Sequence, residues 1–362
     1  DKMCYFPLNQ LEAGAYNLLE NCAEMCSGER LLIVGEKGDN LYFDPQLCKD
    51  LAEVASKLGI VSEILLAEPV SDASQFPENV KNAMKKADRT IFFSRLGDQV
   101  RFSLKKQKAK PIMAYTLNRR YLAAPFATVD FKVMEKVHDA LVELILNSAE
   151  YKILGSCGTK LDSKINKRKE KTIVDFAIKL FPIMIFPPVN CDQMQGVLVI
   201  KRFVTSSSTR AYENSVLVLD EPIFATIDNS RIVEFKGPKF LIEKLKGQLE
   251  RAALITGGDP YKVNSWHTGI NPNTFYDEDP YKNLERWGTV AYGSPRYTHM
   301  HASGIDPGDI AFHLIDATIS FDENLIWDKG RFAFLDRPEI RALMSKEQQK
   351  LINPDTAINI GL

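Results

Sequence analysis

The sequence predicts an α/β protein in which a doubly wound, parallel-sheet domain is followed by an α+β domain. In the first half, short apolar runs alternate with amphipathic stretches, which is typical of a parallel sheet covered on both faces. In the second half, strand-like runs follow one another with turns between them. Because 362 residues exceed the usual size of one core, we expect two domains, over residues 1–150 and 151–362.

The first half is expected to alternate strands with helices. Leu31–Val34 is wholly apolar and predicts a buried strand, and Asp44-Pro45 opens a helix that Gly59 closes. The turn Gly35-x-x-Gly38 lacks the spacings of nucleotide-binding loops, so a plain strand-to-loop turn is favoured. The expected helices are 8–27, 44–57, 77–86 and 131–148, and the expected strands are 31–34, 63–67, 90–94 and 111–116.

The second half is expected to be mainly β. Asp228-Asn229-Ser230 and Asp322-Glu323-Asn324 read as hairpin turns between strand-like runs. One long helix is expected at 239–254. The expected strands are 151–154, 196–204, 215–219, 223–227, 232–235, 288–292, 310–314, 317–321 and 324–327.

The composition excludes several classes of protein. A net charge of −1 indicates neither nucleic-acid binding nor an acidic tail, and the longest apolar runs are too short to span a membrane. The six cysteines contain no CxxC motif and favour buried, reduced thiols, so a cytoplasmic location is expected.

The window from Trp266 to Asp322 predicts a metal site. It holds four of the chain's five histidines, His267, His299, His301 and His313, among several carboxylates and chain-reversing turns. Imidazoles and carboxylates on loops held by a rigid scaffold are what a divalent metal needs. The alternative is a set of surface histidines in long loops.

Several short motifs, taken in order, resemble the aminopeptidase T family and its oxygenase relatives of the 2,5-dihydroxypyridine 5,6-dioxygenase type. The resemblance spans nearly the whole chain, and it depends on the order of the motifs more than on any one of them. The motifs are Gly155-Ser-Cys-Gly-Thr-Lys-Leu161, Phe181-Pro182…Pro188, Gly196-Val-Leu-Val-Ile200, Gly269-Ile-Asn-Pro272, Gly288-Thr-Val-Ala-Tyr-Gly293, His313…Asp316 and Ile319–Gly330.

The resemblance implies different metal sites in the two branches. The aminopeptidase branch holds two metals with glutamates, one in a motif that here reads Phe181-Pro182-Ile183-Met184-Ile185 without a carboxylate. The second family glutamate lies where this chain has His267. Two nearby cations need bridging anions, so the missing carboxylates favour one metal. The oxygenase branch holds one non-haem iron with two histidines and a carboxylate, and His267 matches the first ligand.

Two ligand sets stay open. The family pattern His-x-Asp is replaced here by His313-Leu314-Ile315-Asp316, and an offset of three on a strand puts the two side chains on opposite faces unless a bulge intervenes. The first set is His267, His313 and Asp316. The second is His267, His301 and His313, because the spacing His299-x-His301 also places two imidazoles on one face.

The resemblance implies a mononuclear Fe(II) oxygenase that opens the ring of a small hydroxylated aromatic or heteroaromatic compound with O₂. A hydrolase such as an aminopeptidase, with Zn, Mn or Co, is the alternative, and a metal-free binding protein is a third. A homo-oligomer is also expected. The resemblance also implies a catalytic histidine from the first domain, and this chain has none before His138, so His299, His301, Tyr115 or a metal-bound hydroxide would have to act as the base. The residues expected to position the substrate are Trp266, Tyr276, Tyr292, Arg296 and Tyr297.

Overall fold

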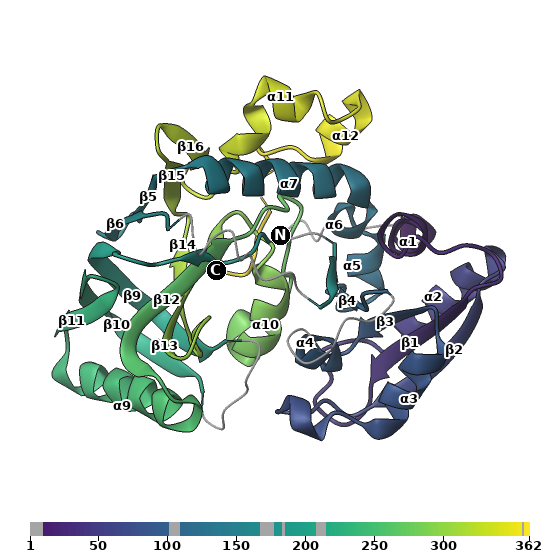
Figure 1. Ribbon diagram of the computed structural model, residues 1–362, viewed down its shortest axis with the longest axis horizontal. Coiled ribbons are helices and arrows are strands. Elements are labelled where there is room, and N and C mark those ends of the chain that lie inside the picture. The colour runs from purple at the N-terminus through teal and green to yellow at the C-terminus, as the bar shows by residue number, and fades with distance from the viewer. Residues whose placement is uncertain (1–9, 101–108, 167–176, 183–184, 208–214, 357) are drawn as a thin grey trace. The chain divides into compact units, whose positions relative to one another are not determined.

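The computed structural model describes residues 10–100, 109–166, 177–182, 185–207, 215–356 and 358–362 (Figure 1). The chain forms two compact units. Unit 1 comprises Asp1–Lys136, Asp175–Met184 and Ser345–Ile352. Unit 2 comprises Val137–Val174, Ile185–Met344 and Asn353–Leu362.

Unit 1 is built on a five-stranded parallel sheet, which confirms the predicted α/β class. Its strands lie in the order β2-β1-β3-β4-β7. The central strand β1 is buried from Leu31 to Glu36, as its continuous apolar run requires. The strands are β1 (Arg30–Glu36), β2 (Val61–Ala67), β3 (Arg89–Phe93), β4 (Ile112–Ala114) and β7 (Lys179–Phe181).

The helices of unit 1 follow the predicted order with tighter bounds. The expected helix 8–27 is an α-helix that continues as a π-helical turn, and Leu8 lies outside the described residues. The predicted helix 131–148 is α7 (Phe131–Asn147), which crosses from unit 1 into unit 2. The others are α1 (Leu11–Tyr16), η2 (Asn17–Cys22), α2 (Gln46–Lys57), η3 (Ala73–Gln75), α3 (Glu78–Lys86), α4 (Leu96–Val100), α5 (Arg119–Ala123), α6 (Pro125–Thr128) and α12 (Lys346–Leu351).

The last residues of β1 pack closely against neighbouring elements. A Cβ on Gly35 would lie 2.6 Å from the sulfur of Cys48 on α2, so only glycine lets this helix approach the strand. The next residue, Glu36, is buried and accepts two hydrogen bonds from the Arg95 guanidinium, at 2.8 and 3.1 Å. Sheets of this strand order bind ligands between the ends of the first and third strands. In this chain an internal ion pair occupies that position.

Unit 2 is built on antiparallel strands, six of which close into a ring. The order runs β10-β11-β12-β13-β14-β9, and β9 also pairs with β10. Strands β6, β5, β15 and β16 extend the sheet from β9, and β8 pairs with β12. The strands are β5 (Glu150–Leu154), β6 (Lys160–Lys164), β8 (Val189–Asn190), β9 (Gln195–Ser206), β10 (Leu217–Asp228), β11 (Arg231–Lys236), β12 (Asp259–Thr268), β13 (Tyr297–Gly304), β14 (Ile310–Ile315), β15 (Thr318–Phe321) and β16 (Asn324–Trp327).

Three features of unit 2 differ from the sequence prediction. The predicted strand 288–292 is wrong, because it belongs to helix α10 (Leu284–Ala291), whose N-cap Asn283 accepts from the Arg286 amide. The predicted strands 215–219 and 223–227 form the single bulged strand β10. Strands β6, β8, β12 and β13 were not predicted. The remaining helical elements are α9 (Lys239–Thr256), η4 (Pro280–Lys282), η5 (Ala333–Asp336) and α11 (Pro338–Arg341).

An aromatic core supports one face of β12. Trp266 packs against the rings of Tyr151, Phe186 and Phe321, with centroids between 5.3 and 5.9 Å apart. Because side chains alternate along a strand, the neighbouring residue His267 points to the opposite face. Among the described residues, no helix is both long enough and apolar enough to cross a membrane.

Candidate metal centre

Three adjacent strands bring four histidines to one face of the sheet. His267 on β12 pairs directly with His299 on β13, which in turn pairs with His313 on β14. His301 lies two residues beyond His299 and therefore on the same face. All four are buried, with at most 7% of each residue exposed. The cross-strand register thus gathers residues that are up to 46 positions apart in the chain.

His267, His299 and His301 form a cluster with the geometry of a metal site. Their ligand atoms all lie within 4.8 Å of one another. The ring centroids of His267 and His299 are 4.0 Å apart, and those of His299 and His301 are 4.9 Å apart. Three imidazoles that are close, buried and fixed on strands need no large movement to share one cation.

A hydrogen bond fixes the tautomer of His267 that can bind a metal through Nε2. Its Nδ1 donates to the carbonyl oxygen of Phe186 at 3.0 Å, which leaves the lone pair of Nε2 available. That Nε2 lies 3.1 Å from Nε2 of His301. Two imidazole nitrogens bound to one metal at about 2.0–2.1 Å would lie roughly 2.9–3.4 Å apart. The donor set therefore fits a zinc-like or iron-like divalent ion.

His313 lies beside the cluster and is held by other bonds. Its Nε2 is 3.0 Å from Oγ1 of Thr205, and its Nδ1 is hydrogen-bonded to the Tyr297 hydroxyl. Burial, with a smaller contribution from His301, lowers the pKa of His313 to about 3, so the ring is neutral at physiological pH. Both ring nitrogens are engaged, whereas a metal ligand needs one of them.

Asp316 is not brought into the histidine cluster. It follows the last residue of β14 with φ of 56°, and the pairing of β14 with β13 runs without a bulge. Its carboxylate accepts two hydrogen bonds from the Arg296 guanidinium, at 2.8 and 3.0 Å. This bidentate ion pair engages both Asp316 and Arg296.

Of the other residues expected to act in catalysis, Tyr297 lies beside the histidine cluster, whereas Tyr115 belongs to the other unit. The Tyr297 ring stacks between His299 and His313, with centroids 5.6 and 5.4 Å away. Tyr292 packs closely on His299 at 4.3 Å. Tyr115 lies in unit 1, where its hydroxyl donates to Asp98.

Sequence reasoning missed two supporting groups, the Phe186 carbonyl and the Thr205 hydroxyl. A backbone carbonyl has no sequence signature, and Thr205 lies on β9, about a hundred residues before His313. The His299-x-His301 spacing was the available signal for the cluster. The choice of histidines that meet in the cluster depends on the register between β12 and β13. That register cannot be read from the sequence.

A glycine contact holds the end of β12 beside the cluster. A Cβ on Gly269 would lie 2.2 Å from the carbonyl carbon of Gly293 and from the oxygen of Ser294. The carbonyl of Gly269 also accepts from the Trp327 indole at 3.0 Å. The backbone at residue 269, two positions after His267, is therefore in direct contact with the backbone at residues 293–294.

Gly269→Ala is expected to destabilise the protein by about 3 kcal/mol or more, because the backbone would have to move to accept the methyl group. Chemical denaturation measures the free energy of unfolding. Gly247→Ala is the matched control, since Gly247 lies in α9 with nothing within 4 Å of the new Cβ. That change should stabilise the protein by about 0.5–1 kcal/mol. Equal stabilities for the two variants would contradict the assigned contact.

The fold and the site together define a two-unit α/β protein with a buried histidine cluster on an antiparallel sheet. No protein-family model and no curated protein matches the sequence. Solved structures that share the fold include the following two. One is 2,5-dihydroxypyridine dioxygenase from Pseudomonas putida KT2440, with 12% identity and a TM-score of 0.57, covering 90% of this chain and 97% of that one.

The other is wild-type AmpT, an aminopeptidase T, from Thermus thermophilus, with 11% identity and a TM-score of 0.51. It covers 90% of this chain and 99% of that one. The resemblance inferred from the ordered motifs is thus confirmed at the level of the fold.

Proposed function

We propose that the chain is a metal-dependent enzyme with one divalent ion held by His267, His299 and His301. The observation that carries this proposal is the convergence of three buried imidazoles, one of them oriented by the Phe186 carbonyl. Among the residues that the structure describes, no second group of three metal-ligating side chains is found. A mononuclear site is therefore favoured over a two-metal site.

The reaction that we propose first is Fe(II)-dependent oxygenation of a small hydroxylated aromatic or heteroaromatic compound. Fe(II) bound by three neutral imidazoles would keep its full positive charge and leave positions for O₂ and an anionic substrate oxygen. The rings of Tyr292 and Tyr297 pack on His299 and suit a flat, apolar substrate. The fold shared with a dioxygenase supports this choice.

A hydrolase using Zn, Mn or Co is the second candidate. The observation that favours it is the absence of a carboxylate from the three-residue cluster, because three histidines with an open fourth position form a known donor set for catalytic zinc. The fold shared with AmpT also supports it.

Metal analysis of protein purified anaerobically and without chelators tests both candidates. About one iron per chain, together with O₂ consumption on hydroxylated aromatic compounds, is expected for the oxygenase. Zinc, manganese or cobalt with turnover of aminoacyl amides would select the hydrolase. Protein that binds none of these metals would contradict both.

We also propose that the chain acts in a reducing compartment such as the cytoplasm, as a homo-oligomer. None of the described cysteines forms a disulfide, and Cys22, Cys48 and Cys191 are buried. Burial raises the pKa of the Cys48 thiol to about 12, which keeps it protonated and unreactive. Light scattering of the purified protein tests the oligomer: a single-chain mass would contradict it.

A further inference from the structure

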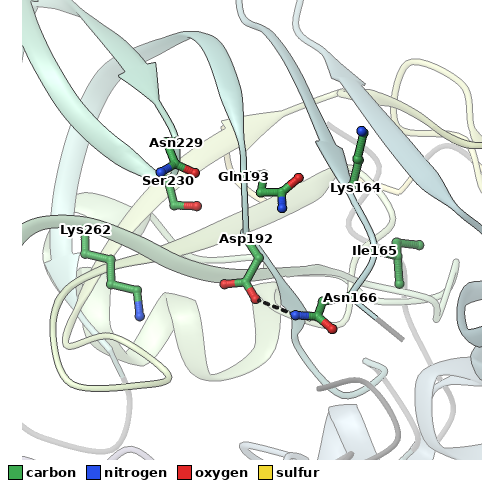
Figure 2. A pocket seen from close by; sticks show the side chains of 8 residues that line it. All are labelled: Lys164, Ile165, Asn166, Asp192, Gln193, Asn229, Ser230 and Lys262. Carbon is green, nitrogen blue, oxygen red and sulfur yellow. Dashed lines mark hydrogen bonds between the residues drawn. The ribbon is translucent and has the colours of Figure 1, made fainter. Parts of the chain in front are cut away.

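A polar pocket lies in unit 2 among residues outside the histidine cluster. It has a volume of about 710 Å³, within the range of small-molecule sites. Four segments line it: the end of β6 and the two residues after it, the turn after β8, the turn between β10 and β11, and β12. The lining residues, drawn in Figure 2, are Lys164, Ile165, Asn166, Asp192, Gln193, Asn229, Ser230 and Lys262.

Long-range hydrogen bonds hold the walls of this pocket together. The Ser230 hydroxyl donates to the carbonyl of Cys191, and the Ser230 amide donates to the carbonyl of Met194 at 2.9 Å. The Ser163 hydroxyl donates to the carbonyl of Asp192 at 2.6 Å. The pocket is therefore formed by cross-linked turns, which need little ordering when a ligand enters.

The lining carries two cations, one anion and several amides. Figure 2 shows Lys164 and Lys262 on opposite sides of the view, with Asp192 between them. The Asp192 carboxylate accepts from the Asn166 amide at 3.4 Å. The Lys262 ammonium lies 3.4 Å from Asp306, and 35% of its side chain is exposed, so it can also reach a ligand.

We propose that this pocket binds a small, hydroxylated, non-aromatic organic anion. Each ammonium group suits a carboxylate or phosphate group, while a simple anion would be repelled by Asp192. Hydroxyl groups on the ligand can donate to the Asp192 carboxylate and bond to the amides of Gln193 and Asn229. Among the lining residues that the structure describes, Ile165 is the one apolar side chain and none is aromatic. The inference is independent of the proposed metal chemistry.

Calorimetric titration of the full chain with three six-carbon probes tests the proposal. Gluconate carries hydroxyls and a charge, sorbitol carries only hydroxyls, and hexanoate carries only the charge. We expect gluconate to bind at least about tenfold more tightly than either of the others. Failure of gluconate to bind, or equal binding of gluconate and hexanoate, would overturn the proposal.

Variants locate the binding. Lys164→Ala and Lys262→Ala should each weaken gluconate binding by about three- to tenfold, because each removes a partly solvated charge contact. Lys160→Ala is the matched control, since it removes an exposed lysine of the same strand that does not line the pocket. Equal weakening by Lys160→Ala would show non-specific attraction and overturn the assignment.

The variant Asp192→Ala tests whether the Asp192 carboxylate accepts a hydrogen bond from a ligand hydroxyl. This change should weaken gluconate binding and strengthen hexanoate binding, because it removes a hydrogen-bond acceptor and a repelling charge together. Two effects of the same sign would contradict the role assigned to Asp192.

Discussion

His301→Ala is expected to lower metal affinity by more than about 100-fold. Changes to groups that only orient a ligand already cost about 10–100-fold, and this variant removes a ligand itself. His301 is suited to the role because its Nε2 lies 3.1 Å from that of His267. Equilibrium dialysis followed by metal analysis measures the loss, and circular dichroism confirms that the variant is folded.

Two further variants make this experiment decisive. His138→Ala is the matched control, because His138 lies on α7 outside the cluster and pairs with Asp139. Asp316→Asn should retain the metal, since that carboxylate is held by Arg296. Loss of metal in Asp316→Asn with retention in His301→Ala would instead support the set His267, His313 and Asp316.

Gly308→Ala is expected to weaken metal binding by about 10–100-fold without removing a ligand. Gly308 has a φ of 107°, and a Cβ there would lie 2.9 Å from the Cβ and carbonyl carbon of His301. The new methyl group would therefore push His301 away from its partners. Competition with a coloured chelator measures the affinity.

Gly158→Ala is the control for backbone strain. Gly158 has nearly the same φ, 105°, but the nearest atom to its new Cβ is 3.8 Å away. Both variants should lose about 1–3 kcal/mol of stability from the left-handed conformation, and only Gly308→Ala should lose metal affinity as well. Similar affinities for the two variants would exclude contact with His301 as the cause.

The sequence predicted the sheet of unit 1 well because its inner strands β1 and β3 are buried on both faces and contain continuous apolar runs. Leu31–Val34 is the clearest case. The sequence could not show that β7 joins this sheet. The strand has only three residues, too few for a periodic pattern, and it lies far along the chain from its partner β4.

Prediction was weakest where the site lies. Strand β12 carries Asn264, Ser265 and His267 along a buried segment, so its pattern does not alternate between apolar and polar residues. The run 288–292 is short and apolar, which suits a strand or a helix equally. The histidine window was therefore visible in the sequence, whereas the choice among its ligands depended on strand register.

In the closed ring of strands in unit 2, the strands fix the positions of the histidines, while the loops between the strands are free to vary. The three histidines lie on β12 and β13, whose ladder is continuous with the rest of the ring and leaves neither strand at an edge. Loops joining these strands can change length and composition while the ladder keeps the imidazoles in place. Such a frame lets the loops vary while the imidazoles keep their positions, and the same fold occurs in a dioxygenase and an aminopeptidase at 11–12% identity to this chain.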